Sequence, residues 1–141
     1  MAEIVKVKSN SKYEELIGYS RVVVAGDTIY VSNTAGRDYG TREIAPDAAG
    51  QARKALKNIE GALASVGAGF KDVVRFRGFV PDPADMEAVN AVYAEVFKGI
   101  DPACTWTCTP LAHHEMKVEF EVTAYRRRDP AAPEERRRIT L

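Results

Sequence analysis

The strictest alternation of apolar and polar residues lies near the end of the chain, in residues 117–125. One face of this run carries Val118, Phe120, Val122 and Ala124, and the other carries Lys117, Glu119, Glu121, Thr123 and Tyr125. A period of two predicts a β-strand that buries its apolar face. If the opposite face lines a cleft, Glu119 or Glu121 becomes a candidate general base; if it faces solvent, both are ordinary surface residues.

Other parts of the chain also have the character of strands. Residues 19–25 and 28–34 are rich in β-branched side chains and are joined by a Gly-Asp pair. They predict a β-hairpin, because glycine adopts positive φ without steric strain. Residues 3–8 predict a further strand, and Cys104 to Cys108 are expected on another. Residues 73–80 complete the set, with Val74, Phe76 and Val80 on one side and Arg75 and Arg77 on the other.

Two stretches carry apolar residues at helical spacing. The first follows Asp47, an expected N-cap, and ends before Gly67, with an apolar face made of Ala52, Ala55, Leu56, Ile59, Leu63 and Val66. The second begins at the Asp-Pro pair of residues 82–83 and ends at Gly99, with an apolar face made of Met86, Val89, Val92, Tyr93, Val96 and Phe97. Asn90 lies at the margin of that face, where its amide either satisfies a buried group or faces a site.

The order β-ββ-α-β-α-ββ predicts an α+β fold, a mixed β-sheet with both helices on one face. We expect one domain over residues 1–128 and a polar tail, rich in Arg, Glu and Pro, over residues 129–141. The sheet face away from the helices combines charged residues with Phe79 and Tyr125. That mixture favours a surface covered by another subunit, so we expect a homo-oligomer.

The charge balance narrows the possible partners. The 141 residues include 20 basic and 20 acidic side chains, which argues against nucleic acid or a membrane as the main partner. Apolar runs are too short to span a bilayer and the N-terminus lacks the apolar core of a signal peptide, so we expect a cytoplasmic protein. Cys104 and Cys108 would lie about 13 Å apart on a strand, too far for a disulfide, and are expected to be free thiols.

The sequence His113-His114-Glu115 raises the question of a metal site. Adjacent histidines on a turn point apart, and a second cluster that would complete a tetrahedral ligand set is missing unless Cys108 joins. The glycine-rich motifs that bind nucleotide phosphates are also missing. We therefore expect neither a metal nor another cofactor.

Six segments in a fixed order resemble the RidA/YjgF family, whose members are also described as reactive intermediate imine deaminases and endoribonuclease L-PSP proteins. The similarity covers roughly residues 15–127. The segments are Gly18–Ser20, Ile29–Asn33, Gln51–Ile59, Val89–Phe97, Pro102–Thr105 and Val118–Ala124. The resemblance implies a chorismate-mutase-like fold and a homotrimer whose sheets form a central barrel, with small-molecule clefts at the subunit interfaces. It also implies hydrolysis of enamines or imines to 2-keto acids and ammonia.

The same resemblance suggests site residues. It places Tyr19, Ser32, Asn90 and Glu121 at pocket positions of the family. We expect Glu121 to be the catalytic residue, and we expect a substrate-binding set of Tyr19, Ser32, Asn33, Asn90, Cys104 and Thr105. Cys104 stands where imine deaminases of the family carry an arginine that holds the substrate carboxylate, and Asn33 stands where the family has glycine. The alternative role for Glu121 is a salt bridge to Arg75 or Arg77 across the sheet.

The departure at Cys104 shapes the functional prediction. A thiol cannot replace a guanidinium, so either another cation, such as Arg37, Arg75 or Arg77, holds the carboxylate, or the substrate is not a small 2-imino acid. The sequence predicts a hydrolytic deaminase of a small enamine or imine other than 2-aminoacrylate. The alternatives are a non-catalytic ligand-binding or regulatory module and an endoribonuclease, against which the neutral charge argues.

Overall fold

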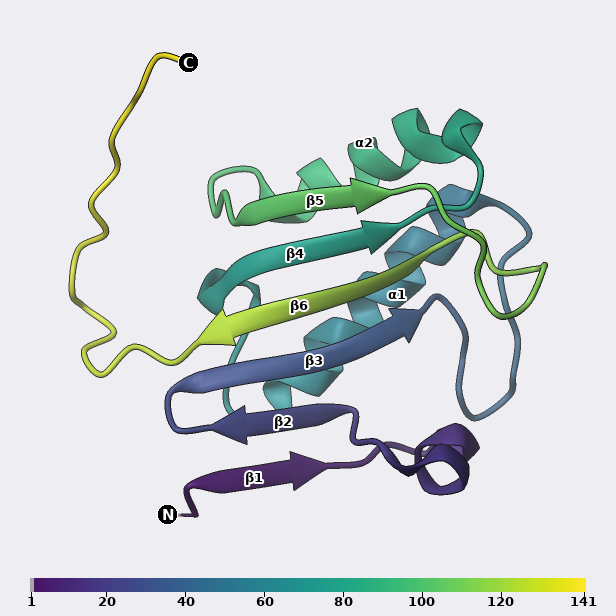
Figure 1. Ribbon diagram of the computed structural model, residues 1–141, viewed down its shortest axis with the longest axis horizontal. Helices are drawn as coiled ribbons and strands as arrows, with labels where there is room; N and C mark the ends of the chain where they lie inside the picture. Colours follow the sequence, from purple (N-terminus) through teal and green to yellow (C-terminus); the bar gives the residue numbers. More distant parts are fainter. Residues whose placement is uncertain (1) are drawn as a thin grey trace.

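Six strands form one twisted sheet in the order β1-β2-β3-β6-β4-β5, seen in the computed structural model, which describes residues 2–141 (Figure 1). All neighbouring strands are antiparallel except β4 and β5, which are parallel. The strand bounds are β1 Ile4–Val7, β2 Val22–Ala25, β3 Thr28–Ala35, β4 Val73–Phe79, β5 Ala103–Thr107 and β6 Glu119–Tyr125. The predicted order of elements and the mixed sheet are confirmed.

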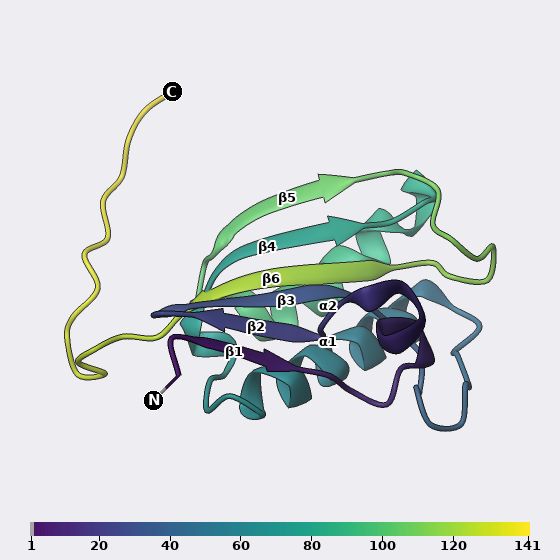
Figure 2. The same ribbon diagram turned by 60° about the horizontal axis from the view of Figure 1, so that its bottom comes forward.

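Both long helices, α1 (Ala48–Ala64) and α2 (Met86–Phe97), cover the same face of the sheet (Figure 2). Asp47 caps α1 as predicted, because its carboxylate accepts a hydrogen bond from the backbone N–H of Gly50 at 3.2 Å. A short 3₁₀ turn at Pro83–Asp85 precedes α2. None of the helices in residues 2–141 has the length and apolar character needed to cross a membrane.

The core lies between the helices and the sheet. The apolar face of β6 is buried there as predicted, and it packs with Ile59, Leu63 and an aromatic group built on Phe76. The ring of Phe76 lies 5.0 Å from that of Phe120 and 5.2 Å from that of Trp106, measured between centroids. A Cβ atom at Gly78 would stand 2.2 Å from the Trp106 ring, so only glycine fits beneath this indole.

Two local predictions were wrong. Val74 is 50% exposed and Val73 takes the buried position, because the register between β4 and β6 shifts between Val73 and Arg75. Such a bulge inserts one residue and reverses the face on which its neighbours lie. The first strand of the hairpin begins at Val22 and not at residue 19. A short π-helical turn at Glu14–Gly18 precedes it, and residues 19–21 connect this turn to the strand. Both cysteines are free thiols, as predicted.

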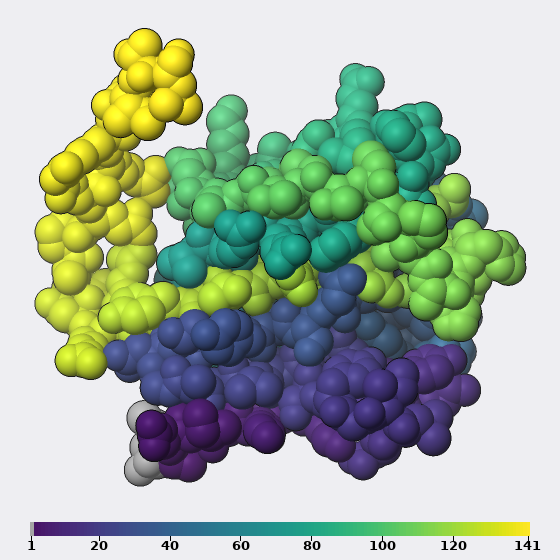
Figure 3. Space-filling view, viewed as in Figure 1, coloured from purple at the N-terminus to yellow at the C-terminus, as the bar shows by residue number. Residues whose placement is uncertain are grey.

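The opposite face of the sheet is open in a single chain, with both helices behind it (Figure 3). Tyr30 and Tyr125 are among its exposed aromatic side chains. Arg77 and Glu121 are register partners there and form an ion pair at 3.2 Å, so the alternative role expected for Glu121 is present. The tail beyond residue 128 leaves the end of β6 and stands away from the sheet (Figure 1).

Candidate functional site

A cavity of about 240 Å³ lies where β3 ends and β6 begins. Residues from 11–21, 33–42 and 112–116 line it together with Glu119. A larger hollow of about 970 Å³ lies between the tail and the start of β4 and β5. Its outer wall is the exposed tail, and its charges are paired with one another, as in the 2.7 Å contact of Arg136 with Asp101. The smaller cavity is the better candidate, because it withdraws a carboxylate from water.

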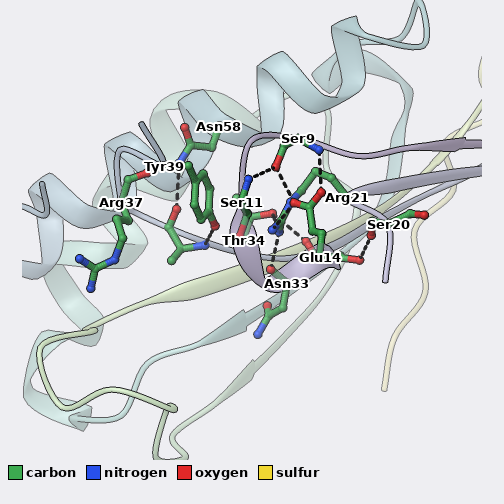
Figure 4. Close-up of polar contacts among 12 residues, drawn as sticks. Ser9, Ser11, Glu14, Ser20, Arg21, Asn33, Thr34, Arg37, Tyr39 and Asn58 are labelled. Atoms are coloured by element: carbon green, nitrogen blue, oxygen red, sulfur yellow. Dashed lines mark hydrogen bonds and ion pairs between the residues drawn. The ribbon is translucent and has the colours of Figure 1, made fainter. Parts of the chain in front are cut away.

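One wall of this cavity is built on a buried ion pair between Glu14 and Arg21 (Figure 4). The π-helical turn places the Glu14 carboxylate so that it accepts hydrogen bonds from Arg21 Nη2 at 3.0 Å and from the backbone N–H of Ser9 at 2.6 Å. Nη1 of Arg21 donates to the carbonyl of Asn33 at 2.8 Å and to the hydroxyl of Thr34 at 3.1 Å. The pair is fully hydrogen-bonded, so it fixes the N-terminal segment against the end of β3.

Aromatic rings enclose the Arg21 guanidinium. It lies 5.7 Å from the ring centroid of Tyr19 and 5.2 Å from that of Tyr39. The Tyr39 hydroxyl accepts a hydrogen bond from the backbone N–H of Ala35 at 3.1 Å, which holds the ring beside the cavity. Burial raises the pKa of Tyr39, an effect that the nearby Arg21 opposes. Tyr39 therefore stays a neutral phenol near pH 7 and forms a wall of the cavity.

Glu119, the first residue of β6, places its carboxylate in the cavity. Its Oε2 accepts a hydrogen bond from Nδ2 of Asn33 at 2.5 Å. Burial raises the pKa of Glu119, although Arg21, the Asn33 hydrogen bond and His113 all act to lower it. A carboxylate with a raised pKa is a stronger base than one in water, which suits it to accept a proton from a water molecule.

Asn33 presents a second acceptor at the same place. Its Oδ1 is buried and has no hydrogen-bond partner among residues 2–141. A buried acceptor without a partner is unfavourable, so this oxygen favours an N–H or O–H donor brought by a ligand or a water molecule. Together, Glu119 and Asn33 offer two acceptors to one small molecule.

The loop after β3 adds cationic groups to the lining of the cavity. Nη2 of Arg37 pairs with Glu115 at 2.7 Å, and its Nη1 donates to the carbonyl of Arg42 at 2.7 Å. The Arg42 guanidinium lies 5.7 Å from the ring centroid of Tyr13. His113 lies near the same tyrosine, with 6.4 Å between the ring centroids. The cavity therefore combines the Glu119 carboxylate with several cationic groups.

The structure brings together only part of the predicted site. Tyr19 and Asn33 line the cavity, whereas Ser32 lies beside it and its hydroxyl donates to the carbonyl of Ser20 at 2.7 Å. Glu121 lies on the open face, paired with Arg77 and outside the cavity. Figure 1 shows that β6 and β4 separate β3 from β5.

Three further residues of the predicted set lie away from the cavity in a single chain. Asn90 is exposed on α2, and Cys104 and Thr105 are exposed on the edge strand β5. Cys104 is the register partner of Phe76, so its side chain lies on the face of the sheet that the helices cover. Tyr93 of α2 lies on that face too. Burial and then the adjacent Cys104 raise the pKa of Tyr93. These positions could join the cavity only through a neighbouring subunit.

Sequence reasoning missed several residues of the cavity. Glu14 and Arg21 were not singled out, although an arginine inside a run of β-branched residues is a sign of a buried charge that needs a partner. Tyr39 and Arg42 lie in a loop that carries no periodic signal. Glu119 shares the alternation of Glu121, and only its position opposite the end of β3 distinguishes the two.

The histidines do not form a metal site with neighbouring ligands. Within the part of the chain that the structure describes, no group of three His, Cys, Asp or Glu side chains converges. His113 and His114 are exposed on the turn before β6, and the nearest carboxylate to His114 is that of Glu115, at 3.7 Å.

The fold and the cavity define a class: a small α+β protein with a ligand-sized cavity that combines a carboxylate with cationic groups. Comparison with known proteins identifies the family. The family described as Endoribonuclease L-PSP matches residues 10–126. The chain therefore belongs to this family, which includes the RidA, YjgF and UK114 proteins.

Individual relatives agree with this assignment. The chain is 40% identical over 105 residues to the RutC family protein UK114 of Drosophila melanogaster, covering 74% of this chain and 75% of that protein. It is 38% identical over 100 residues to the 2-iminobutanoate/2-iminopropanoate deaminase of Rattus norvegicus, covering 70% and 73%. The crystal structure of Rv2704 from Mycobacterium tuberculosis, a YjgF/YER057c/UK114 family member, superposes with a TM-score of 0.79 at 36% identity, covering 86% and 98%. The predicted resemblance is confirmed.

Proposed function

We propose that the protein hydrolyses the C=N bond of a small imine, or of an enamine after its conversion to the imine, in the cavity beside Glu119. The observation that carries this proposal is the half-buried Glu119 carboxylate, with its raised pKa, next to the unpartnered Oδ1 of Asn33. The names of several relatives, 2-iminobutanoate/2-iminopropanoate deaminases, support the same reaction class.

The two acceptors suit a water molecule that donates one hydrogen bond to each of them. Such a water directs a lone pair away from Glu119 and Asn33, toward the electrophilic carbon of a bound imine. As the water oxygen bonds to carbon, its proton passes to Glu119 and the C=N bond becomes a single bond. Protonated Glu119 then returns a proton to nitrogen.

The second half of the reaction releases ammonia. Glu119 takes up the remaining hydroxyl proton and passes it to the nitrogen, and the C–N bond breaks as the C=O bond forms. The products are a carbonyl compound and ammonia, and the only other reactant is water. No redox change takes place, so the chemistry needs only a base that can also act as an acid, which is the role we assign to Glu119 in place of Glu121.

The remaining predicted residues enter through a proposed homotrimer. In that assembly the exposed edge strand β5 of one copy would approach the cavity of the next and bring Cys104 and Thr105, with Asn90 nearby, to a shared cleft. The exposed Tyr30, Tyr125 and Val74 of the open face favour contact between copies, since apolar side chains gain stability when they leave water. Light scattering measures the mass of the assembly and tests this arrangement.

Ammonia release tests the reaction. Imines are generated in situ by an amino-acid oxidase from amino acids with small, large and aromatic side chains, and their hydrolysis is followed with and without the protein. We expect acceleration of part of this panel, and we expect Glu119→Gln to lower the rate about 10²- to 10⁴-fold, which is the usual contribution of a general base.

The matched control is Glu121→Gln, the same change two residues away on the same strand face. We expect it to keep nearly full activity. If Glu121→Gln loses turnover and Glu119→Gln keeps it, the assignment of the base is wrong. If the natural protein accelerates none of the imines, the non-catalytic ligand-binding alternative gains support.

A further inference from the structure

The cavity contains one guanidinium that the fold does not use. Arg21 is paired with Glu14 and Arg37 is paired with Glu115. Among residues 2–141, Arg42 forms no ion pair, and its side chain donates no hydrogen bond there. A cation that lines a cavity without a partner is available to a ligand.

The loop that carries Arg42 is held in an unusual backbone conformation. Arg42 has a φ of 70°, in the left-handed region that residues other than glycine adopt rarely. Its N–H donates to the carbonyl of Asp38 at 2.7 Å, and its own carbonyl accepts the hydrogen bond from Arg37. A bridge between Arg37 and Ile44 closes the loop. Strained residues that the surrounding contacts hold in place are concentrated at ligand sites.

Tyr13 supports the Arg42 side chain from one face. Its ring lies 5.7 Å from the guanidinium carbon, and Lys12 lies 5.3 Å from the same ring. An aromatic ring contacts a guanidinium through the flat face and leaves the N–H groups at its edge directed outward. Those N–H groups match the two oxygens of a carboxylate, which they bind as a fork.

We propose that Arg42, supported by Tyr13, is the residue that holds an anionic group of the substrate, most simply a carboxylate. This inference rests on the proposed function, because it places the reacting C=N group at Glu119 and the carboxylate at Arg42, which lines the same cavity. The substrates would then be imines that bear a carboxylate.

The first experiment measures binding without turnover. The natural protein, Arg42→Gly, Arg42→Lys and Arg53→Ala are titrated calorimetrically with 2-oxobutanoate, a carboxylate that resembles the expected product. Glycine suits the positive φ at this position, so Arg42→Gly should fold at least as well as the natural protein. Arg53 pairs with Glu95 on the surface of the helices, and its removal controls for the loss of one positive charge.

The expected result is a weakening of 2-oxobutanoate binding by about 10- to 100-fold in Arg42→Gly, which matches the loss of a charged hydrogen-bonded contact. Arg42→Lys should recover part of the affinity, because it keeps the charge and loses the fork. Arg53→Ala should bind as the natural protein does. Equal binding by the natural protein and Arg42→Gly overturns the proposal, and so does a natural protein that does not bind 2-oxobutanoate.

The second experiment separates this proposal from the reaction. The rates of hydrolysis are compared for the imine formed from 2-aminobutanoate by an amino-acid oxidase and for the uncharged imine formed from butylamine by an amine oxidase. We expect Arg42→Gly to lower kcat/KM for the first about 10- to 100-fold and to leave the second unchanged. An equal loss on both imines overturns the role of Arg42. If the natural protein hydrolyses neither, the proposed function fails, while the titration still decides whether Arg42 binds a carboxylate.

Discussion

Glu119 and Glu121 lie two residues apart on the same face of β6, yet their surroundings differ. Glu119 lies in the cavity, where burial raises its pKa and Asn33 donates a hydrogen bond to it. Glu121 lies on the open face with its side chain 34% exposed, paired with Arg77. The difference shows that the strand supplies only the direction of a side chain. Its chemistry is set by the segments packed against that end of the strand.

The largest effect on folding should come from the ion pair that shapes the cavity. Glu14→Ala leaves the buried Arg21 without its carboxylate, and we expect it to lower the free energy of unfolding by about 3–5 kcal/mol. Urea denaturation measures the loss. The control is Glu15→Ala, whose exposed pair with Lys8 at 3.2 Å should contribute less than about 1 kcal/mol. Equal losses in the two variants would remove the distinction between the buried and the exposed site.

A second expected effect is a change of stability with pH at Glu119. Because burial raises the pKa of Glu119 in the folded state, the folded protein favours the protonated carboxyl. Stability from this group is therefore complete below the pKa of the unfolded chain and is lost as pH rises through the folded pKa. Glu119→Gln removes the charge, so its free energy of unfolding relative to the natural protein should increase from pH 4 to pH 8. Thermal unfolding across this range measures it, and a decrease would contradict the burial argument.

Asn33→Gly should shift the pH dependence of turnover by a smaller amount. The hydrogen bond from Asn33 lowers the pKa of Glu119, so its removal should raise that pKa further. The activity of a base that must be deprotonated would then reach half its maximum at a higher pH. The pH profile of kcat/KM measures the shift. A profile that does not move, or moves to lower pH, would show that Asn33 does not act on the base.

The smallest effect is expected on the open face. The Arg77 side chain is 48% exposed in a single chain. Arg77→Ala breaks its pair with Glu121 and should lower the free energy of unfolding by no more than about 1 kcal/mol. Denaturation at several protein concentrations measures it. A loss above about 2 kcal/mol that grows on dilution would show that other copies cover this face and that the pair is buried in the assembly.

Much of the fold follows from the sequence because its signals are local. The period of two in β6, the N-cap at Asp47 and the Gly-Asp turn of the hairpin depend on residues close together in the chain. The bulge at Val74 could not be read in this way, since it is a property of how β4 pairs with β6. Periodicity describes one strand and contains no information about register with another.

The cavity could be predicted only in part. Alternation placed Glu119 and Glu121 on one face but could not rank them, because their difference arises from Asn33, about 86 positions earlier in the chain. The family resemblance pointed to Tyr19, and the departure from the family pattern pointed to Asn33; the structure places both in the cavity. The resemblance could not point to Arg42, which lines the cavity from a loop without a periodic signal and has a positive φ.

The pairing of β3 with β6 also has a consequence for the synthesis of the protein. Ile29 pairs with Ala124, so the centre of the sheet joins strands from opposite ends of the chain. At a translation rate of about 5–20 residues per second, the β2–β3 hairpin is made roughly 5–20 s before β6. During that interval one edge of β3 lacks its partner and can pair with other chains. Conditions that slow elongation late in the message should therefore favour aggregation of the newly made chain.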